Sequence, residues 1–456
     1  MTVVPVGAPA ISHSPEYLRR RFFNWFPLGL TYATFYMARY NLNVSSTELM
    51  TRFHWTKAEF GWIATAGFWT YALSVLANGP LTDRLGGRRA ILVASLGTAA
   101  INGLVGFLFM NGWAAKVLVG MSLLYAVNQY FQSFAALAIV KINAPWFHVR
   151  ERGVFGGIFG IMISSGYFLA MTVGGWILAY LPWYCVFLIP SAAVATMHWV
   201  DRKFIVDTPR DAGFSNFDTG DATSHRQDKD EPIDRAYLMQ NVLANPVILT
   251  LVAAEFCTGF VRQGLLLWFV PFLKEVHHIH HGTTLFSVAT IGITVGGIVG
   301  GLLCGFLSDK VFGSRRPPVA FIFYLGQIGS LLLLGQAQNP AVAAVLIGFT
   351  CLWIFGVHGM LSGTASMDFG GTKAAATVTG LLDGIQYVAS GLTGFLLGSL
   401  LDRFGWAAWT WMIIPFSVIG GGLMLTLWNA TPKNTRVTVP KKDFPVQKPE
   451  EPPLPA

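Results

Sequence analysis

Gly79-Pro-Leu-Thr-Asp83-Arg84 recurs 226 residues later as Gly305-Phe-Leu-Ser-Asp309-Lys310. Each copy ends a long apolar block, and a pair of arginines follows each copy within a few residues. A repeat at a fixed spacing indicates that a chain is built from copies of one structural unit. The two copies therefore predict two similar halves.

The composition is that of a membrane protein. The 456 residues have a mean hydropathy of +0.51, and only 12% of them are charged, against about 25% in soluble proteins. The apolar residues also gather in blocks of about 20 or more, the length with which an α-helix crosses a bilayer. We therefore expect an all-α membrane protein.

Twelve apolar blocks are expected to cross the membrane, in two sets of six. They lie near 23–45, 57–79, 88–110, 113–140, 153–175, 179–200, 246–273, 284–307, 317–336, 340–366, 376–401 and 407–430. The predicted organisation is an N-terminal segment (1–22), a six-helix bundle (23–200), a polar linker (201–242), a second six-helix bundle (243–430) and a disordered tail (431–456).

Further residue pairs extend the repeat at offsets of 221 to 227 residues. They are Arg88-Arg89 with Arg315-Arg316, Arg152 with Lys373, Trp183 with Trp406, and Arg39 with Arg262. We therefore expect pseudo-symmetric bundles in parallel orientation, related by an axis along the membrane normal.

Basic residues set the expected orientation. They concentrate in alternate loops: Arg19–Arg21, Arg84 with Arg88 and Arg89, Arg150 with Arg152, Lys310 with Arg315 and Arg316, Lys373, and Lys441 with Lys442. Positive loops stay in the cytoplasm, so the chain is expected in the inner (plasma) membrane with both termini and the linker cytoplasmic. The net charge of +8 is explained in this way, without nucleic acid, and no cleaved signal peptide is expected.

Two arginines lie inside membrane blocks, where charge is costly and usually functional. Arg39 shares a helical face with Tyr32 and Tyr36, and Arg262 shares one with Glu255. Each lies 16 residues into its block, or roughly 24 Å. Arginine binds phosphate or carboxylate through paired hydrogen bonds, so the pair predicts a central site for a dianion. The alternative is that both extend to the outer surface.

The loop Gly79-x-Leu-x-Asp83-Arg84-x-Gly86-Gly-Arg88-Arg89 resembles the signature loop of the major facilitator superfamily. The resemblance implies that carrier fold and alternating access between two bundles. It also implies that charged loop residues form bridges that break as the bundles rock. The expected gating residues are Asp83, Arg84, Arg88, Asp309 and Arg315.

A narrower resemblance is to the organophosphate:phosphate antiporter family. It rests on Phe35-Tyr-Met-Ala-Arg39-Tyr-Asn41, Phe260-Val-Arg262-Gln-Gly264, Asn128-Gln-Tyr-Phe-Gln132 and Lys373-Ala-Ala-Ala-Thr-Val-Thr-Gly380. The family resemblance implies that Arg39 and Arg262 bind a phosphoryl group, and that the cavity is lined by Tyr32, Tyr36, Tyr71, Gln132 and Tyr387. Ile163 and Val75 replace a histidine and a lysine of glycerol-3-phosphate transporters, which puts that substrate in doubt.

Three other side chains have open interpretations. Glu255 is either a proton site or a partner that neutralises an empty cavity. Asp383 either contacts a polar part of the substrate or bridges to another helix, and His358 either packs or lines the cavity. The cluster His277, His278, His280 and His281 and the four cysteines lack metal-site spacing, and we expect no metal, cofactor or enzymatic activity.

The expected function is exchange of an organophosphate for inorganic phosphate by a monomer in the bilayer. The partners are thus a small anionic substrate and phosphate or, in the alternative, a proton. Two alternatives are proton-coupled symport of another organic anion, such as a sugar acid or carboxylate chelator, and sensing of a sugar phosphate by a transporter-like receptor.

Overall fold

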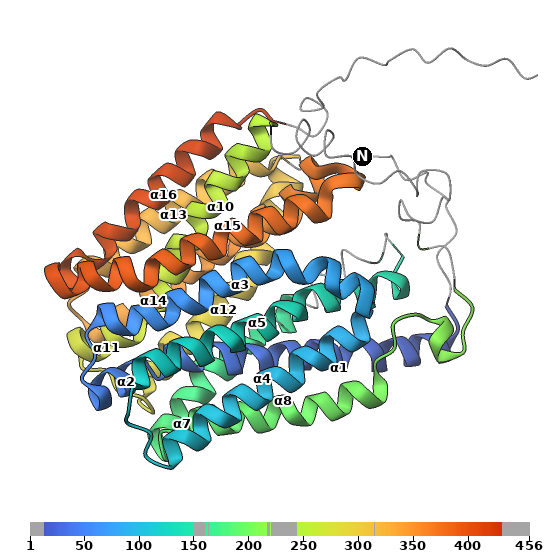
Figure 1. Cartoon of the computed structure of the whole chain (residues 1–456). Helices are drawn as coiled ribbons and strands as arrows, with labels where there is room; N and C mark the ends of the chain where they lie inside the picture. Colours follow the sequence, from blue (N-terminus) through green and yellow to red (C-terminus); the bar gives the residue numbers. More distant parts are fainter. Residues whose placement is uncertain are drawn as a thin grey trace, which may run out of the picture.

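A computed structural model describes residues 13–148, 151, 160–162, 164–216, 219, 244–313 and 315–430, with backbone alone over 363–377 and at 379. The described chain is a set of long helices running in roughly one direction through the molecule (Figure 1). The segments 1–12 and 431–456 and most of the expected linker lie outside the described residues.

The first half contains the helices that precede the linker. They are α1 (Pro15–Val44), α2 (Ser46–Phe53), α3 (Lys57–Leu85), α4 (Gly87–Met110), α5 (Val117–Asn143), α7 (Gly174–Tyr180) and α8 (Cys185–Phe204). Shorter elements are η1 (Ala144–Trp146), the π-helix η2 (Phe168–Val173) that leads into α7, and η3 (Arg210–Ala212).

The second half follows the linker. Its helices are α10 (Pro246–Leu266), α11 (Phe269–His277), α12 (Thr284–Phe306), α13 (Arg316–Gln336), α14 (Pro340–His358), α15 (Ser366–Phe404) and α16 (Trp409–Thr426). Two π-helices, η6 (Leu307–Val311) and η7 (Gly359–Ala365), extend α12 and α14, and η8 (Trp406–Ala408) precedes α16.

Local sequence signals start these helices. Asn245 and Asn339 each precede a proline, and each side chain accepts a backbone N–H of the first turn. Thr56 and Glu59 form a reciprocal capping box at the start of α3. Polar N-caps satisfy the free N–H groups of a first turn, and proline fits there because it has none to satisfy.

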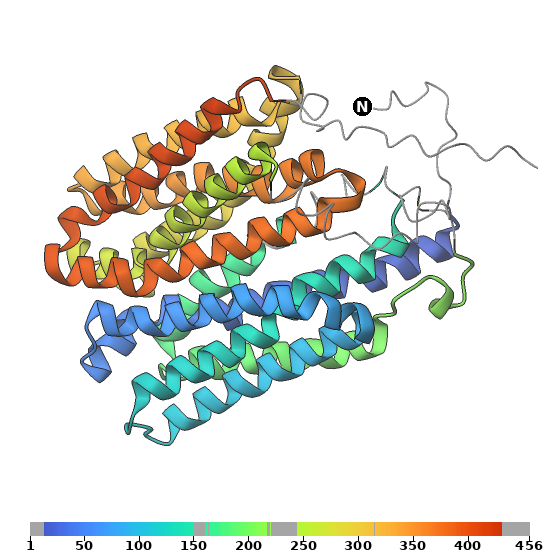
Figure 2. The ribbon, with the colours of Figure 1, turned by 45° about the horizontal axis from the view of Figure 1, so that its top comes forward.

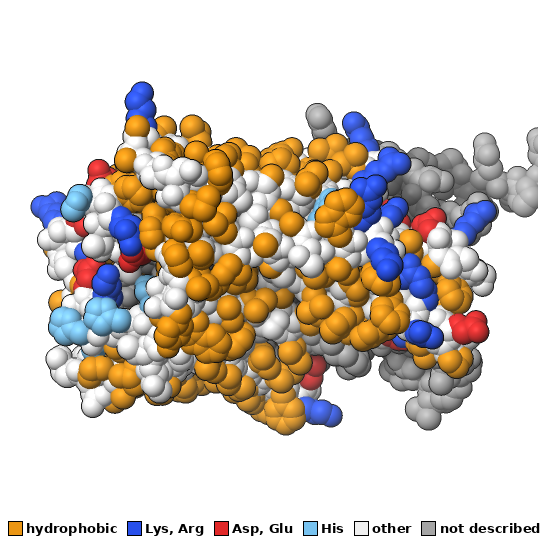
Figure 3. Space-filling view, turned by 90° about the horizontal axis from the view of Figure 1, so that it is seen from below, with side chains coloured by type: hydrophobic (Ala, Val, Ile, Leu, Met, Phe, Trp, Pro, Cys, Tyr) orange, Lys and Arg blue, Asp and Glu red, His pale blue; other side chains and the backbone are white. Residues whose placement is uncertain are grey.

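Ten helical segments of the described chain are long and apolar enough to cross a membrane. The helices α1 and α8 run beside them (Figure 1), which is consistent with the expected twelve. Large apolar side chains such as Leu73, Leu123 and Val140 are more than 60% exposed, and Figure 3 shows the broad apolar surface to which such side chains belong. An apolar surface of this extent is the surface that lipid covers.

The two ends of the molecule differ in charge. Figure 3 shows Lys and Arg side chains gathered at one end, which we call the basic end. Arg84, Arg89 and Arg202 are exposed there. The opposite end holds the turn after α2, the start of α3, and the end of α15.

The halves meet through α3 and α15, which lie side by side in Figures 1 and 2. Gly61 and Gly394 bring the two backbones together, because a Cβ on Gly61 would lie 2.1 Å from the Gly394 carbonyl oxygen. Hydrogen bonds join Lys57, Ala58, Thr65 and Trp69 of α3 to the second half of α15. Toward the basic end the two ribbons separate (Figure 2).

Candidate substrate site

Arg39 is fully buried in the last part of α1, five residues before the helix ends at Val44. Its Nε donates to Gln132 Oε1 on α5 at 2.8 Å, and its Nη1 donates to the Tyr387 hydroxyl on α15 at 3.0 Å. Its Nη2 has no partner among the described residues. All described hydrogen-bond partners of Arg39 are therefore neutral, and one donor is left over.

Amide side chains behind Gln132 fix its position. Gln132 Nε2 donates to Asn128 Oδ1 at 3.4 Å, Asn102 donates to the same oxygen at 3.1 Å, and Asn41 donates to Asn102 at 2.7 Å. This series of hydrogen bonds links α5, α4 and α1. Buried polar groups linked in this way hold one another in a single arrangement, so Arg39 rests on a rigid support.

Arg262 lies at the matching place in α10 and is 3% exposed. Its Nη2 donates to Gln386 Oε1 at 3.0 Å, and its Nη1 lies 3.2 Å from His358 Nε2. Its Nε has no partner among the described residues. Arg262 is thus also held by neutral groups.

Glu255, two turns before Arg262, is connected to it through those same groups. Glu255 Oε1 accepts from Gln386 Nε2 at 2.9 Å and lies 2.9 Å from His358 Nδ1. Because Arg262 can only donate, His358 Nε2 accepts from it. The proton of a neutral His358 then sits on Nδ1, which lies 2.9 Å from Glu255 Oε1 and 2.7 Å from Gln386 Nε2. Glu255 is fully buried, and its Oε2 has no partner in the described part of the chain.

Tyr387 joins the two arginines. Its hydroxyl accepts from Arg39, and its ring lies 5.8 Å from the Arg262 guanidinium carbon. The ring of Tyr71 packs on Tyr387 at 4.1 Å and lies 4.8 Å from the Arg39 guanidinium carbon. The arginines therefore converge on one aromatic pair, and neither reaches the outer surface.

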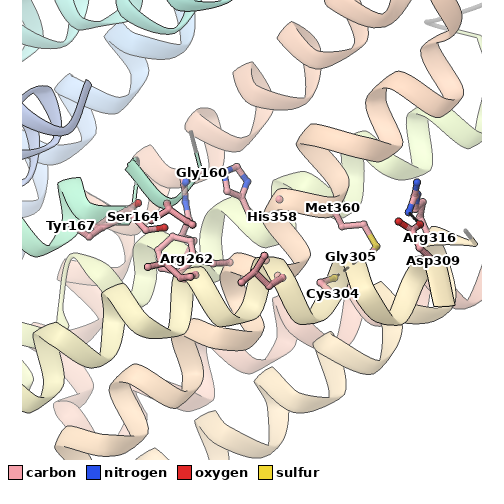
Figure 4. Close-up of a pocket in the computed structure, with 18 of the residues that line it drawn as sticks. Gly160, Ser164, Tyr167, Arg262, Cys304, Gly305, Asp309, Arg316, His358 and Met360 are labelled. Atoms are coloured by element: carbon pink, nitrogen blue, oxygen red, sulfur yellow. Dashed lines mark hydrogen bonds and ion pairs between the residues drawn. The ribbon is translucent and has the colours of Figure 1, made fainter. Parts of the chain in front are cut away.

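A cavity of about 360 Å³ reaches this cluster from the basic end. Figure 4 shows Arg262 and His358 near one end of it and Asp309 and Arg316 at the other. Between them the lining consists largely of glycine and apolar residues of α12 and η7, and Tyr36 and Ser164 come from the first half. Arg39 does not line the cavity.

The other expected site residues lie around this cluster. Tyr36 is 7% exposed, and its ring lies 5.4 Å from the Arg39 guanidinium carbon and 5.3 Å from the ring of Tyr32. Asp383 lies on α15, one turn before Tyr387, within electrostatic range of Arg262 and Glu255. Ile163 lies outside the described residues, and Val75 is partly buried.

The expected gating residues lie at the basic end, but most of them bond within their own half. Asp83 pairs with Lys141 of α5 at 2.8 Å, and Asp309 pairs with Arg316 at 2.7 Å. The Arg88 guanidinium donates to the Arg202 carbonyl, and Arg315 Nε donates to the Phe312 carbonyl. Arg84 is exposed.

The opposite end holds ties between the halves. Asp402 accepts from the backbone N–H groups of Lys57 and Ala58 at 3.1 and 2.8 Å, and Lys57 pairs with Glu275 at 2.9 Å. His281 Nε2 donates to the Val44 carbonyl at 3.0 Å, and burial lowers the pKa of His281 to about 4. His281 is thus neutral at pH 7, with its proton on Nε2.

Some residues of the cluster carry weak sequence signals. Gln386 contacts both Arg262 and Glu255 but lies in a glycine-rich helix with no motif around it. Away from the cluster, Lys141 was not expected as the partner of Asp83. The spacing of Glu255, seven residues before Arg262, pointed to the link but not to its two intermediates. No group of three metal-ligating side chains occurs in the described part of the chain.

Comparisons with known proteins agree with this architecture. Residues 28–394 match the family model of the Major Facilitator Superfamily. A bacterial homologue of the human lysosomal transporter Spinster, solved in an inward-facing and unoccupied conformation, has the same fold. Its TM-score is 0.73 at 16% identity, and the match covers 94% of this chain and all of that one.

Curated relatives extend over almost the whole chain. A probable hexose phosphate transport protein of Chlamydia pneumoniae is 26% identical over 92% of this chain and 93% of its own length. The glycerol-3-phosphate transporter of Bacillus subtilis is 27% identical over 91% and 93%. The membrane sensor protein UhpC of Salmonella typhimurium is 26% identical over 94% and 98%. These relatives confirm the resemblance to organophosphate carriers, and the chain belongs to the Major Facilitator Superfamily of membrane transport proteins.

Proposed function

We propose that this protein exchanges an organophosphate for inorganic phosphate across the inner membrane by alternating access. The observation that carries the proposal is the pair Arg39 and Arg262, one buried in each half and both in contact with Tyr387. The relatives named for hexose phosphate and glycerol-3-phosphate support the substrate class.

The surroundings of the arginines suit a removable anion. Their partners Gln132, Tyr387, Gln386 and His358 are neutral, and a phosphoryl group forms stronger, charge-assisted hydrogen bonds with guanidinium than these groups do. The free Nη2 of Arg39 and the free Nε of Arg262 are further donors within the described chain. A bound phosphoryl group would take up these free donors, while Gln132 and Tyr387 continue to hold Arg39 in place.

The distribution of contacts supports alternating access. The described hydrogen bonds and ion pairs between the halves lie between the arginine cluster and the opposite end. The cavity extends from Arg262 the other way, to the basic end. We infer that this state opens to the basic end, which by its charge is cytoplasmic, and that Asp83, Arg84, Arg88, Asp309 and Arg315 form bridges between the halves when that end closes.

The charge on Arg39 accounts for exchange. Arg39 has no acidic hydrogen-bond partner among the described residues, and an unpaired charge is costly in a closed, dehydrated site. A bound anion removes that cost in both directions of transport. Inorganic phosphate would then serve as the return substrate.

Phosphate counterflow in proteoliposomes tests the proposal. Vesicles loaded with inorganic phosphate are expected to take up labelled phosphate, whereas vesicles without it are not. Arg39→Lys is expected to reduce exchange strongly because lysine lacks the paired donors. Arg52→Lys, on an exposed arginine that pairs with Glu48, serves as the matched control and should exchange like the wild type.

Two results would contradict exchange. Uptake that needs no internal phosphate and follows a pH gradient would show symport. Saturable phosphate binding without any flux would show a sensor.

A further inference from the structure

Four buried or partly buried groups of opposite sign surround the proposed anion site. Arg39 and Arg262 supply two positive charges, and Glu255 and Asp383 supply two carboxyl groups. With both acids ionised the four groups together are formally neutral, although neither acid is a hydrogen-bond partner of Arg39. A phosphate dianion would pair with Arg39 but would leave an excess of negative charge in the low-dielectric interior around Arg262, which is unfavourable. Binding a dianion therefore calls for a compensating positive charge.

The contacts of His358 show where that charge can be placed. His358 Nε2 accepts from Arg262, and His358 Nδ1–H faces Glu255 Oε1, which also accepts from Gln386 Nε2. An anion that takes the Arg262 Nη1–H group leaves Nε2 with a free lone pair facing the cavity. A proton on Nε2 would give His358 two donors, one for the anion and one for Glu255.

We propose that the pair of His358 and Glu255 takes up one proton whenever an anion binds to Arg262. The proton adds to His358 Nε2 and comes from the acid form of the buffer in the surrounding solution, and no bond in the protein breaks. The imidazolium then lies between the Glu255 carboxylate and the bound anion. The anion and a proton thus enter and leave the site together, which deepens the proposed function and rests on it.

The groups around the pair favour this assignment. From α10 itself Arg262 and Cys257 lie nearby, from α13 Tyr324, and from α15 Asp383. Helix α16, which also packs on α10, has no titratable residue, and neither has η7, which follows His358. Helix α14 contributes Cys351 besides His358. Tyr36 and Tyr167 line the cavity beside His358. Among the described residues around the pair, His358 is thus the base that contacts both Arg262 and the acid Glu255.

A path for the proton is present. Arg262, His358, Asp309 and Arg316 line one cavity, and the last two lie at the basic end (Figure 4). Water that enters at this end meets His358 on its Nε2 side, because Nδ1 faces Glu255. Glu255 itself is fully buried and receives charge compensation through His358.

Isothermal titration calorimetry with inorganic phosphate and with glycerol-3-phosphate tests the proposal on the full chain in lipid nanodiscs. At pH 8 both ligands are mostly dianions, because the second pKa of a phosphoester is about 6. Titrations in buffers of different ionisation enthalpy report the number of protons taken up. We expect about one proton per bound anion in the wild type, and about none in Glu255→Gln and His358→Asn.

Glu48→Gln is the matched control, because it removes, by an equally conservative change, an acid that pairs with Arg52 outside the site. It is expected to keep the uptake of one proton, whereas Asp383→Asn shows whether the other acid near Arg262 takes up the proton instead. A wild-type count of zero, or a count that is lost in Asp383→Asn and kept in Glu255→Gln, overturns the proposal. If neither Glu255→Gln nor His358→Asn binds phosphate, the numbers of protons taken up by the wild type and by Asp383→Asn still decide whether the proposal stands.

The outcomes also separate this inference from the proposed function. Binding of either ligand without proton uptake leaves phosphate exchange standing and removes only the proton. If neither ligand binds to the wild type at any concentration tested, the proposed function fails first.

Discussion

Arg39 and Arg262 occupy equivalent positions in the two halves, but their neighbours differ. Arg262 is connected to Glu255 through Gln386 and His358. Arg39 rests on a chain of amides that contains no acid. The pseudo-symmetric pair is therefore asymmetric in charge, and Arg39 is the arginine that depends most on a bound anion.

Tyr387 is the residue that couples the two arginines, and Tyr387→Phe tests this role. The substitution keeps the ring beside Tyr71 and Arg262 and removes only the hydroxyl that accepts from Arg39. A hydrogen bond to a charged group contributes about 1.5 kcal/mol or more, so phosphate affinity is expected to fall by roughly tenfold.

The measurement is the phosphate concentration that half-saturates counterflow. Tyr130→Phe removes the same hydroxyl from a tyrosine that is 37% exposed on the outside of α5, and it should leave that concentration unchanged. An unaltered value in Tyr387→Phe would mean that the hydroxyl does not position Arg39.

Sequence reasoning singled out residues whose mere presence in a membrane helix is improbable. A charged residue deep in an apolar block is rare, and this rarity drew attention to Arg39, Arg262 and Glu255. Gln386 and Asn102 could not be found in this way, because a single amide in a membrane helix also serves in helix packing. Their importance depends on which side chains face them in three dimensions.

Among the helices, α3 is fastened at its start in two ways. Thr56 and Glu59 cap it from within, and Asp402 at the end of α15 accepts two of its first backbone N–H groups from the other half. The cross-half tie adds a carboxylate at a positive helix terminus, where it is favoured by the helix dipole. It therefore stabilises the state closed at the opposite end.

Asp402→Ala is expected to shift the protein toward the state open at the opposite end. Loss of a carboxylate that accepts helix N–H groups costs about 0.5–2 kcal/mol, enough to change a two-state population several-fold. Spin labels at Arg52 and His280, one on each half, would show this by double electron–electron resonance as a larger fraction of long distances.

Glu59→Ala is the control at the same helix start. It removes a cap inside one half, so it should lower thermal stability and leave the distance distribution unchanged. Equal distributions in Asp402→Ala and the wild type would show that Asp402 is not a tie between conformations.

Hydropathy predicted where the helices lie but not where they break. The expected block 246–273 is divided by Leu267 and Trp268 into α10 and α11, and the block 340–366 changes from α14 to the π-helix η7 after His358. Such changes depend on packing against other helices, as π-helical turns generally do, and they leave no mark in apolar periodicity.

Across the whole molecule, the two halves that the sequence repeat predicts are consistent with the helical fold, and the family match agrees with both. The halves touch from the arginine cluster to the opposite end, and a cavity occupies the other side of the cluster. The sequence predicted two bundles, but not which end would be closed, because both states of a carrier are built from the same helices.

The most direct test of the two-arginine site is a double-mutant cycle on the affinity for inorganic phosphate with Arg39→Lys, Arg262→Lys and the double variant. If both side chains bind one anion, each single change should cost about 1.5–3 kcal/mol. The double variant should then differ from their sum by about 0.5 kcal/mol or more. An additive cycle, or an affinity that one of the two changes leaves intact, would contradict a shared site.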